Sequence, residues 1–188
     1  SSAMTNEAQL FLRQLLTNPR QVSAIAPSSP RLARAMAEGL GPRSGRVVEF
    51  GPGTGRLTEA ILAAGVAPRD LTLFEMNEDF VHHLRQRFPG VEVVHGPAQM
   101  APQTVQPGVA KVISGLPLLS MPPALRESIV GAAFAVLAPG GEYVQFTYGP
   151  NPPFPADQAA AMGLRITPGR RVWANLPPAR IYRYSRAA

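Results

Sequence analysis

Apolar residues along the chain gather in short runs that are separated by longer mixed segments. The runs predict five strands, at Arg46–Phe50, Leu71–Glu75, Val91–His95, Ala110–Ser114 and Glu142–Tyr148. The segments between them predict helices over Arg56–Ala64, Asn77–Phe88 and Pro122–Leu137. Strands that alternate with helices of this length favour right-handed crossovers, and so predict a parallel sheet with helices on both faces.

The two ends of the chain break this alternation. Near the N-terminus, a helix predicted over Thr5–Asn18 has four apolar residues on one face, namely Phe11, Leu12, Leu15 and Leu16. Ser29 followed by Pro30 is typical of a helix start and predicts a second helix that ends at Gly39. Near the C-terminus, a short helix around Ala156–Met162 precedes two strand-like runs. These runs predict a hairpin, and with it a seven-stranded, mostly parallel sheet whose last strand is antiparallel.

The chain has 188 residues, of which 45% are hydrophobic and 16% charged, and its mean hydropathy is near zero. We therefore expect one domain over 1–188, with N-terminal helices in 5–40 that form a lid and a sheet core in 46–188. No apolar run approaches the roughly 20 residues of a membrane-spanning helix, and the start of the chain lacks a secretory pattern. These features predict a soluble, cytoplasmic protein.

Composition also limits the available chemistry. Cysteine is absent, which excludes disulfides and thiolate sites. His82, His83 and His95 do not form a metal site, because the first two are adjacent and would point to different sides of a helix. Lysine and arginine number 18 against 12 acids, and all but one of these cations are arginine, whose planar fork suits phosphate. This charge predicts an anionic partner, either nucleic acid or an acidic membrane. The alternative is that the charge only keeps the protein soluble.

The stretch "VVEFGPGTGR" places three glycines on alternate positions directly after the first strand. Ligands bind at this position in parallel α/β sheets, where glycine lets a ligand lie against the backbone. A dinucleotide fingerprint would have its third glycine at position 56, where this chain has arginine. The pattern is therefore G-x-G-x-G, which weakens a prediction of NAD.

Two acids refine the prediction for this loop. Glu49 lies two residues before the first glycine, where it disfavours a pyrophosphate and favours an ammonium group. Glu75 ends the second strand, twenty residues beyond Gly55, where a carboxylate can accept hydrogen bonds from ribose hydroxyls. S-adenosylmethionine carries an ammonium group, a sulfonium and a ribose, and no phosphate. The pattern predicts this cofactor, and the alternative is a structural turn with two unrelated acids.

Together, "VVEFGPGTG", "LTLFE" and "LAPGGEYVQF" resemble the class I S-adenosylmethionine-dependent methyltransferases over roughly Arg46–Tyr148, and the hairpin is similar to the antiparallel end of their Rossmann-like sheet. The resemblance implies S-adenosyl-L-methionine as cofactor and S-adenosyl-L-homocysteine as product. It implies cofactor contacts from Glu49, Gly51, Gly53, Thr54, Glu75 and Met76. The loop "HGPAQM" lacks the acid that many members use for adenine, so Ala98 and Gln99 are expected there. Ser28 or Ser29 is expected to touch the cofactor where "QVSAIAPSS" folds over it.

The fourth strand runs into "ISGLPLLSMP", which is similar to the motif of amino-methylating enzymes. Methyl transfer is an in-line displacement, in which a protein mainly positions the nucleophile. The Leu116-Pro117 turn is expected to aim backbone carbonyls at an amine, with Ser114 as a further acceptor, and a plain strand-to-helix connection is the alternative. Tyr148 is expected to accept the amine's hydrogen bond or to face a methylammonium group, although packing would also explain it. No strong general base is evident, so we expect the amine to lose its proton to water or through Tyr148.

Three segments, "FLRQLLTNPRQVSAIAPSSPRLARAM", "SGLPLLSMP" and "EYVQFTYGP", resemble the bacterial soluble-type phospholipid N-methyltransferases. The resemblance implies stepwise methylation of phosphatidylethanolamine to phosphatidylcholine. We expect Thr5–Asn18 to contact an anionic membrane surface, and Arg180 and Arg183 to bind lipid phosphate. We therefore expect a peripheral protein at the inner face of the cytoplasmic membrane, with no nucleic-acid partner and no obligate protein partner.

Two other functions stay open. An rRNA adenine N6-dimethyltransferase resembles the chain in "EFGPGTGRLT". Against it, Leu118 stands where such enzymes have an aromatic residue that stacks on a flipped adenine, and we expect no appended helical domain for RNA. The third function is a catalytically silent module that binds S-adenosylmethionine, and the intact "SGLPLLSMP" turn argues mildly against it.

Overall fold

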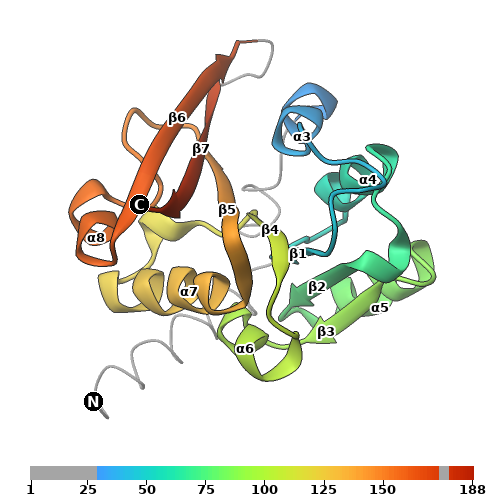
Figure 1. Cartoon of the computed structure of the whole chain (residues 1–188). Helices are drawn as coiled ribbons and strands as arrows, with labels where there is room; N and C mark the ends of the chain where they lie inside the picture. The colour runs from blue at the N-terminus through green and yellow to red at the C-terminus, as the bar shows by residue number, and fades with distance from the viewer. Residues whose placement is uncertain (1–28, 174–177) are drawn as a thin grey trace.

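The computed structural model describes residues 29–173 and 178–188. Within these ranges the chain forms one seven-stranded sheet flanked by helices (Figure 1). The strands are β1 (Val47–Phe50), β2 (Leu71–Glu75), β3 (Glu92–His95), β4 (Val109–Ser114), β5 (Leu137–Thr147), β6 (Leu164–Val172) and β7 (Ala179–Arg186). The α-helices are α3 (Pro30–Met36), α4 (Arg56–Ala63), α5 (Glu78–Arg87), α6 (Ala101–Thr104), α7 (Pro123–Val136) and α8 (Ala156–Ala161). The helix predicted over Thr5–Asn18 lies outside the described residues.

The sheet has the strand order β3-β2-β1-β4-β5-β7-β6. The first five strands of the chain pair in parallel, whereas β7 is antiparallel to both of its neighbours, β5 and β6. The predicted antiparallel end of the sheet is therefore confirmed. The strand order reverses at β1, which has β2 on one side and β4 on the other. Ligands bind at such a reversal in open parallel sheets, outside the carboxyl ends of the strands.

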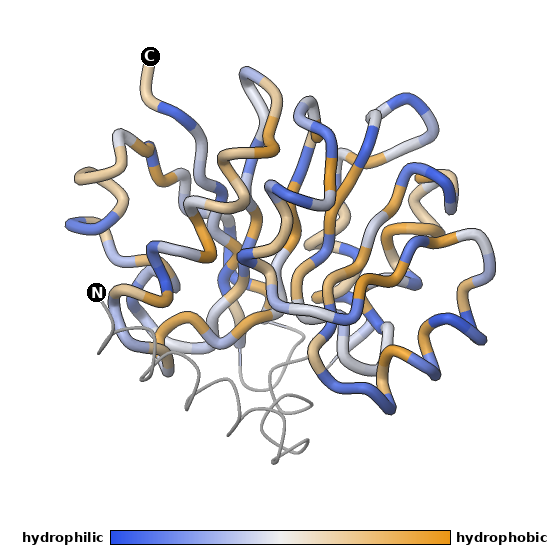
Figure 2. The backbone as a smooth tube through the Cα atoms, turned by 90° about the horizontal axis from the view of Figure 1, so that it is seen from below, coloured by the Kyte–Doolittle hydropathy of each residue, from blue (hydrophilic) through white to orange (hydrophobic). Residues whose placement is uncertain are grey.

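Helices cover both faces of the sheet, as predicted. On one face α3, α4 and α5 contribute Leu32, Leu57 and Leu84 to a buried cluster. On the other face α6 and α7 contribute Ala101 and Ile129 to a second cluster. Orange hydrophobic stretches run through the middle of the molecule in Figure 2, and many blue hydrophilic ones lie in loops at its rim. Burial of the apolar side chains supplies the main driving force for this arrangement.

The elements differ from the predictions mainly at their boundaries. The strand β5 begins at Leu137, five residues earlier than predicted, because "LAPGG" joins the pairing with β4 through a register shift. The short helix α6 was not predicted, because its 4 residues are too few to show the repeat of apolar positions that marks a helix. The helix α3 starts as predicted, since Ser29 Oγ accepts a hydrogen bond from the Leu32 amide at 3.1 Å. None of the described helices is both long and apolar enough to cross a bilayer.

Candidate active site

The candidate site lies at the carboxyl ends of β1, β2 and β4. The register places Phe50, the last residue of β1, beside Phe74 and Ser114, so three loops start at one edge of the sheet. The Gly51 amide donates to the Phe74 carbonyl at 3.0 Å. The Gly115 amide donates to the Phe50 carbonyl at 2.9 Å. Backbone hydrogen bonds thus connect the glycine loop to both neighbouring strands.

The three loop glycines adopt positive φ values, 67° at Gly51, 57° at Gly53 and 96° at Gly55. A Cβ atom at Gly51 would lie 2.7 Å from Leu116 Cδ2, and one at Gly55 would lie 2.6 Å from the Phe88 ring. A Cβ atom at Gly53 would meet no heavy atom within 4 Å among the described residues. Two glycines therefore permit close packing, whereas Gly53 borders open space in which a ligand can lie against the backbone.

Glu49, near the end of β1, is fully buried. Its Oε1 accepts a hydrogen bond from Thr58 Oγ1 at 2.5 Å. Its Oε2 is buried and has no hydrogen-bond partner among the described residues. Burial raises the pKa of Glu49 to about 8, against the lowering effect of the Thr58 hydrogen bond and with a further rise from the charge of Glu75. Because a buried oxygen without a partner is costly, this geometry favours a cationic ligand at Oε2.

Glu75 ends β2 and is 4% exposed. Its Oε1 accepts a hydrogen bond from the Gly53 amide and its Oε2 one from the Asn77 amide, each at 2.9 Å. Burial raises the pKa of Glu75, and these amides oppose the rise. Each carboxylate oxygen has a second lone pair, so the group that fixes the glycine loop can also accept hydrogen bonds from a ligand hydroxyl.

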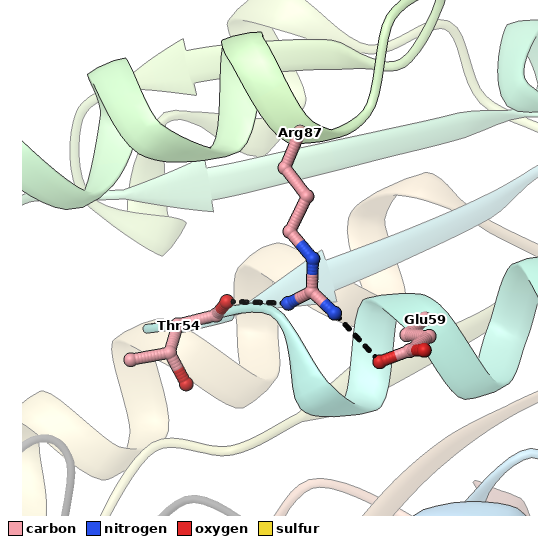
Figure 3. Close-up of polar contacts among 3 residues, drawn as sticks. All are labelled: Thr54, Glu59 and Arg87. Carbon is pink, nitrogen blue, oxygen red and sulfur yellow. Dashed lines mark hydrogen bonds and ion pairs between the residues drawn. The ribbon is translucent and has the colours of Figure 1, made fainter.

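An arginine at the end of α5 connects the glycine loop to α4 (Figure 3). Arg87 Nη1 donates to the Thr54 carbonyl at 3.0 Å, and Arg87 Nη2 lies 2.7 Å from Glu59 Oε2. The Arg87 guanidinium also lies 4.9 Å from the centroid of the Phe88 ring, against which Gly55 packs. Sequence reasoning missed Arg87, because nothing in its own helix indicates a contact 33 residues away.

The residues predicted near adenine lie beyond the ends of β2 and β3. Met76 is partly buried, and its carbonyl lies 3.0 Å from His95 Nε2. Ala98 is 6% exposed and begins a 3₁₀ turn, in which Gln99 is partly exposed. Ser29 lines a cavity of about 470 Å³ between α3 and α4. Ser28 lies outside the described residues.

The turn after β4 is held by a buried polar network. Ser114 Oγ accepts a hydrogen bond from the Leu116 amide at 3.1 Å and is also hydrogen-bonded to the Tyr143 hydroxyl. The Tyr143 hydroxyl donates to Gln145 Oε1, and Gln145 Nε2 donates to the Leu116 carbonyl. That carbonyl also accepts from the Leu118 amide at 3.0 Å. The expectation that this turn aims backbone carbonyls at an amine stays a prediction, and the Leu116 carbonyl itself accepts two hydrogen bonds within the turn.

A cavity of about 200 Å³ opens beside this turn. Leu116 and Tyr148, two of the predicted catalytic residues, both line it, as does Gln145. Tyr148 is partly exposed and packs edge-on against Phe146, with ring centroids 5.4 Å apart. Sequence reasoning missed Gln145, although a glutamine inside the apolar run "EYVQFT" was a signal that could have found it.

The structure separates the two arginines predicted to bind phosphate. Arg180 pairs with Thr147 at the carboxyl end of β5, and its Nε is buried without a hydrogen-bond partner among the described residues. Arg183 pairs with Val144, nearer the start of β5, and its Nη1 lies 3.6 Å from Glu142 Oε1. Arg180 therefore lies at the edge that carries the site, whereas Arg183 is engaged by an acid away from that edge.

Comparison with known proteins adds to this geometry. The family described as a methyltransferase domain matches residues 47–141. The ornithine lipid N-methyltransferase of Singulisphaera acidiphila is 33% identical over 146 residues, which cover 73% of this chain and 76% of that protein. The chain belongs to the class I S-adenosylmethionine-dependent methyltransferases. The small subunit rRNA methyltransferase A of a Synechococcus species is 38% identical to this methyltransferase over 91 residues, which cover 46% of this chain and 32% of that protein.

Solved structures confirm the fold of this methyltransferase. The Burkholderia thailandensis 1,6-didemethyltoxoflavin-N1-methyltransferase has a TM-score of 0.72 at 15% identity, over 100% of this chain and 90% of that one. The glycopeptide N-methyltransferase MtfA has a TM-score of 0.66 at 16% identity, over 86% of this chain and 95% of that one. The cofactor of the methyltransferase is S-adenosylmethionine. The residues present fit it, since within the described part of the chain Glu49 Oε2 is buried without a hydrogen-bond partner and Gly53 borders open space.

Proposed function

We propose that the protein transfers methyl groups from S-adenosylmethionine to the amino group of phosphatidylethanolamine and of its mono- and dimethyl derivatives, towards phosphatidylcholine. The observation that carries the proposal is the similarity to a lipid N-methyltransferase across 73% of this chain and 76% of the relative. The cavity beside the turn after β4 supports it, because it places partly apolar walls at the edge of the sheet where the cofactor residues lie. In this proposal the enzyme works as a peripheral protein at the inner face of the cytoplasmic membrane.

The cofactor residues have distinct roles in this proposal. Glu49 Oε2 pairs with the ammonium group, and Gly53 lets the methionine part lie against the backbone, beside Gly51 and Thr54. Glu75 accepts hydrogen bonds from the ribose hydroxyls. Met76, Ala98 and Gln99 surround the adenine. Ser28 or Ser29 contacts the cofactor from the segment "QVSAIAPSS", which folds over it. When bound, the cofactor supplies an electrophilic methyl group on its sulfonium.

On the acceptor side, the chain mainly positions an amine. Gln145 and Ser114 hold the turn at Leu116, so the cavity wall has one geometry. Tyr148 lies in the same cavity, where its oxygen accepts a hydrogen bond from the amine or its ring faces a methylammonium group. The amine loses its proton to water or through Tyr148. Fixed placement of the nucleophile supplies most of the rate in such an in-line displacement.

Arg180 is the proposed contact for the lipid phosphate. It lies at the carboxyl end of β5, and its buried Nε has no hydrogen-bond partner among the described residues. An acidic oxygen from the substrate would supply that partner. Phosphatidylethanolamine offers a phosphate for this contact and an ornithine head group offers a carboxylate, so the two lipids are compared directly as acceptors.

The decisive experiment offers radiolabelled S-adenosylmethionine with phosphatidylethanolamine vesicles, ornithine lipid vesicles or undermodified ribosomal RNA. We expect label in phosphatidylethanolamine, and chromatography would then count the methylations. Arg180→Gln should reduce this transfer by roughly tenfold, whereas Arg165→Gln, an exposed arginine at the start of β6, should not. Label only in ornithine lipid would change the acceptor, label only in RNA would favour an adenine enzyme, and cofactor binding without label would favour a silent module.

A further inference from the structure

A groove of about 560 Å³ lies between α3 and the end of β6, and it shares no lining residue with the cavity beside the turn after β4, which we call the acceptor cavity. Two elements supply its cations: Arg31 and Arg34 come from α3, and Arg170 and Arg171 from β6. Glu38 is the one acid among its described lining residues. No ion pair found within 29–173 and 178–188 engages any of these four arginines. The groove therefore presents an excess of positive charge.

The same groove contains an exposed tryptophan. The Trp173 side chain is 69% exposed, more than any other large apolar residue in the described part of the chain. The Arg171 guanidinium lies 5.7 Å from the centroid of its ring. Tryptophan combines an apolar body with a polar N–H and is enriched at membrane interfaces. Arginines beside an exposed tryptophan suit the boundary between lipid phosphates and acyl chains.

Strand register places this groove at the edge of the sheet that carries the active site. Arg171 pairs with Arg180, which in turn pairs with Thr147. Thr147 follows Gln145 by two residues, and Gln145 pairs with Ser114 at the end of β4. In Figure 1, α3, the end of β6 and the start of β7 lie at the top of the molecule. A membrane bound at the groove would thus lie at the side of the protein where the acceptor cavity opens.

We propose that Arg31, Arg34, Arg170, Arg171 and Trp173 form a docking surface for an anionic lipid bilayer. The guanidinium groups contact lipid phosphates, and Trp173 enters the headgroup layer. The choice of a lipid surface rests on the proposed function. Single-stranded nucleic acid is the other polyanion that such charge attracts, but it binds on several successive aromatic side chains. Among the described lining residues, Trp173 is the only aromatic one.

Fluorescence of the full chain tests the docking surface directly, because Trp173 is its only tryptophan. Vesicles that contain phosphatidylglycerol should shift the emission to the blue and protect the ring from acrylamide, whereas neutral phosphatidylcholine vesicles should not. Sedimentation with the anionic vesicles while the emission stays unchanged would overturn the proposal, because the contact would then lie elsewhere. A shift with single-stranded RNA and none with vesicles would also overturn it.

Variants test the arginines. Arg31→Gln/Arg34→Gln and Arg170→Gln/Arg171→Gln should each lower the partition onto anionic vesicles by roughly tenfold to thirtyfold, at about 1 kcal/mol per arginine. The matched control is Arg43→Gln/Arg165→Gln, which removes the same charge from two exposed positions before β1 and at the start of β6. An equal loss in the control would show a general charge effect and contradict a defined surface.

Methyl transfer to phosphatidylethanolamine in detergent micelles separates this inference from the proposed function. The Arg31→Gln/Arg34→Gln variant should keep its rate on micelles while it loses rate on vesicles. Methyl transfer on micelles, together with a Trp173 emission that anionic vesicles leave unchanged, would refute the docking surface and leave the proposed function intact. Vesicle docking through Trp173 without any lipid methylation would refute the proposed function and leave the docking surface intact.

Discussion

The cofactor half and the acceptor half of the active site are built in different ways. In the cofactor half, the groups come from two short segments, and backbone amides of Gly53 and Asn77 hold Glu75 in place. In the acceptor half, a side chain on β5 holds the turn after β4, across 29 residues of sequence. Both halves depend on strand pairing, across 22 and 29 residues, but backbone amides fix the carboxylate in the first half, whereas a side chain fixes the turn in the second.

The largest expected effect tests the charge in the cofactor half. Glu49→Gln should weaken S-adenosylmethionine binding by roughly a hundredfold at about pH 8.5, because the ammonium loses a buried charge partner. Calorimetry would measure the dissociation constant. Glu92→Gln is the matched control, since Glu92 is exposed at the start of β3. Equal binding by wild type and Glu49→Gln would refute the role of Glu49.

The next effect is a pH dependence from the same carboxyl. Burial holds the pKa of Glu49 at about 8 in the free protein, and a bound ammonium favours the carboxylate. Binding should therefore release a proton, and affinity should rise by roughly tenfold per pH unit between about pH 6 and 8. Glu49→Gln should remove this slope. Calorimetry in buffers of different ionisation enthalpy would count the protons, and a flat profile in the wild type would contradict the linkage.

The same pKa predicts how pH affects folding without the cofactor. The folded pKa lies above the ordinary value of 4.5, so burial favours the protonated carboxyl. This contribution to the free energy of unfolding is complete below pH 4.5 and is lost as pH rises through about 8. Denaturant titration of wild type and Glu49→Gln checks the sign, since the variant should lose less stability over that range.

A smaller effect tests the acceptor half. Gln145→Leu removes the donor to the Leu116 carbonyl and the acceptor for Tyr143, so the turn should lose its fixed geometry. Turnover should fall by roughly fivefold to tenfold while cofactor affinity stays unchanged. Gln158→Leu is the matched control, because Gln158 is also buried and hydrogen-bonded but lies in α8. A parallel loss of cofactor affinity would show that the two halves are not separate.

The smallest effect concerns the connection between the glycine loop and α4. Arg87→Gln should lower the free energy of unfolding by about 0.5 kcal/mol, because its ion pair with Glu59 is partly exposed. Cofactor affinity should fall by no more than about threefold, through a looser Thr54 backbone. Thermal unfolding and calorimetry would measure both quantities. A larger loss of affinity than of stability would show that Arg87 acts on the ligand and not only on the loop.

Much of the cofactor half was predictable from sequence, because alternate glycines and acids at the ends of two predicted strands form a pattern that can be recognised without knowing which atoms meet. The acceptor half was less accessible. The turn at Leu116 was recognised and Gln145 stands out in its apolar run, but the contact between the Gln145 side chain and the Leu116 carbonyl depends on the pairing of β4 with β5. Arg87 was missed for the same reason, since its contacts cross between helices.

The sequence by itself determined the alternation of strands and helices, the antiparallel hairpin and the position of the glycine loop, because apolar periodicity and turn residues act over a few neighbours. Only the tertiary structure decided which polar atoms meet. Among the residues that it describes, Glu49 Oε2 is buried without a partner, and the Leu116 carbonyl accepts two hydrogen bonds. Arg183 is paired with Glu142, whereas Arg180 lies at the edge of the sheet that carries the site. The physical reason is that burial and hydrogen bonding depend on elements distant in sequence, which only packing brings together.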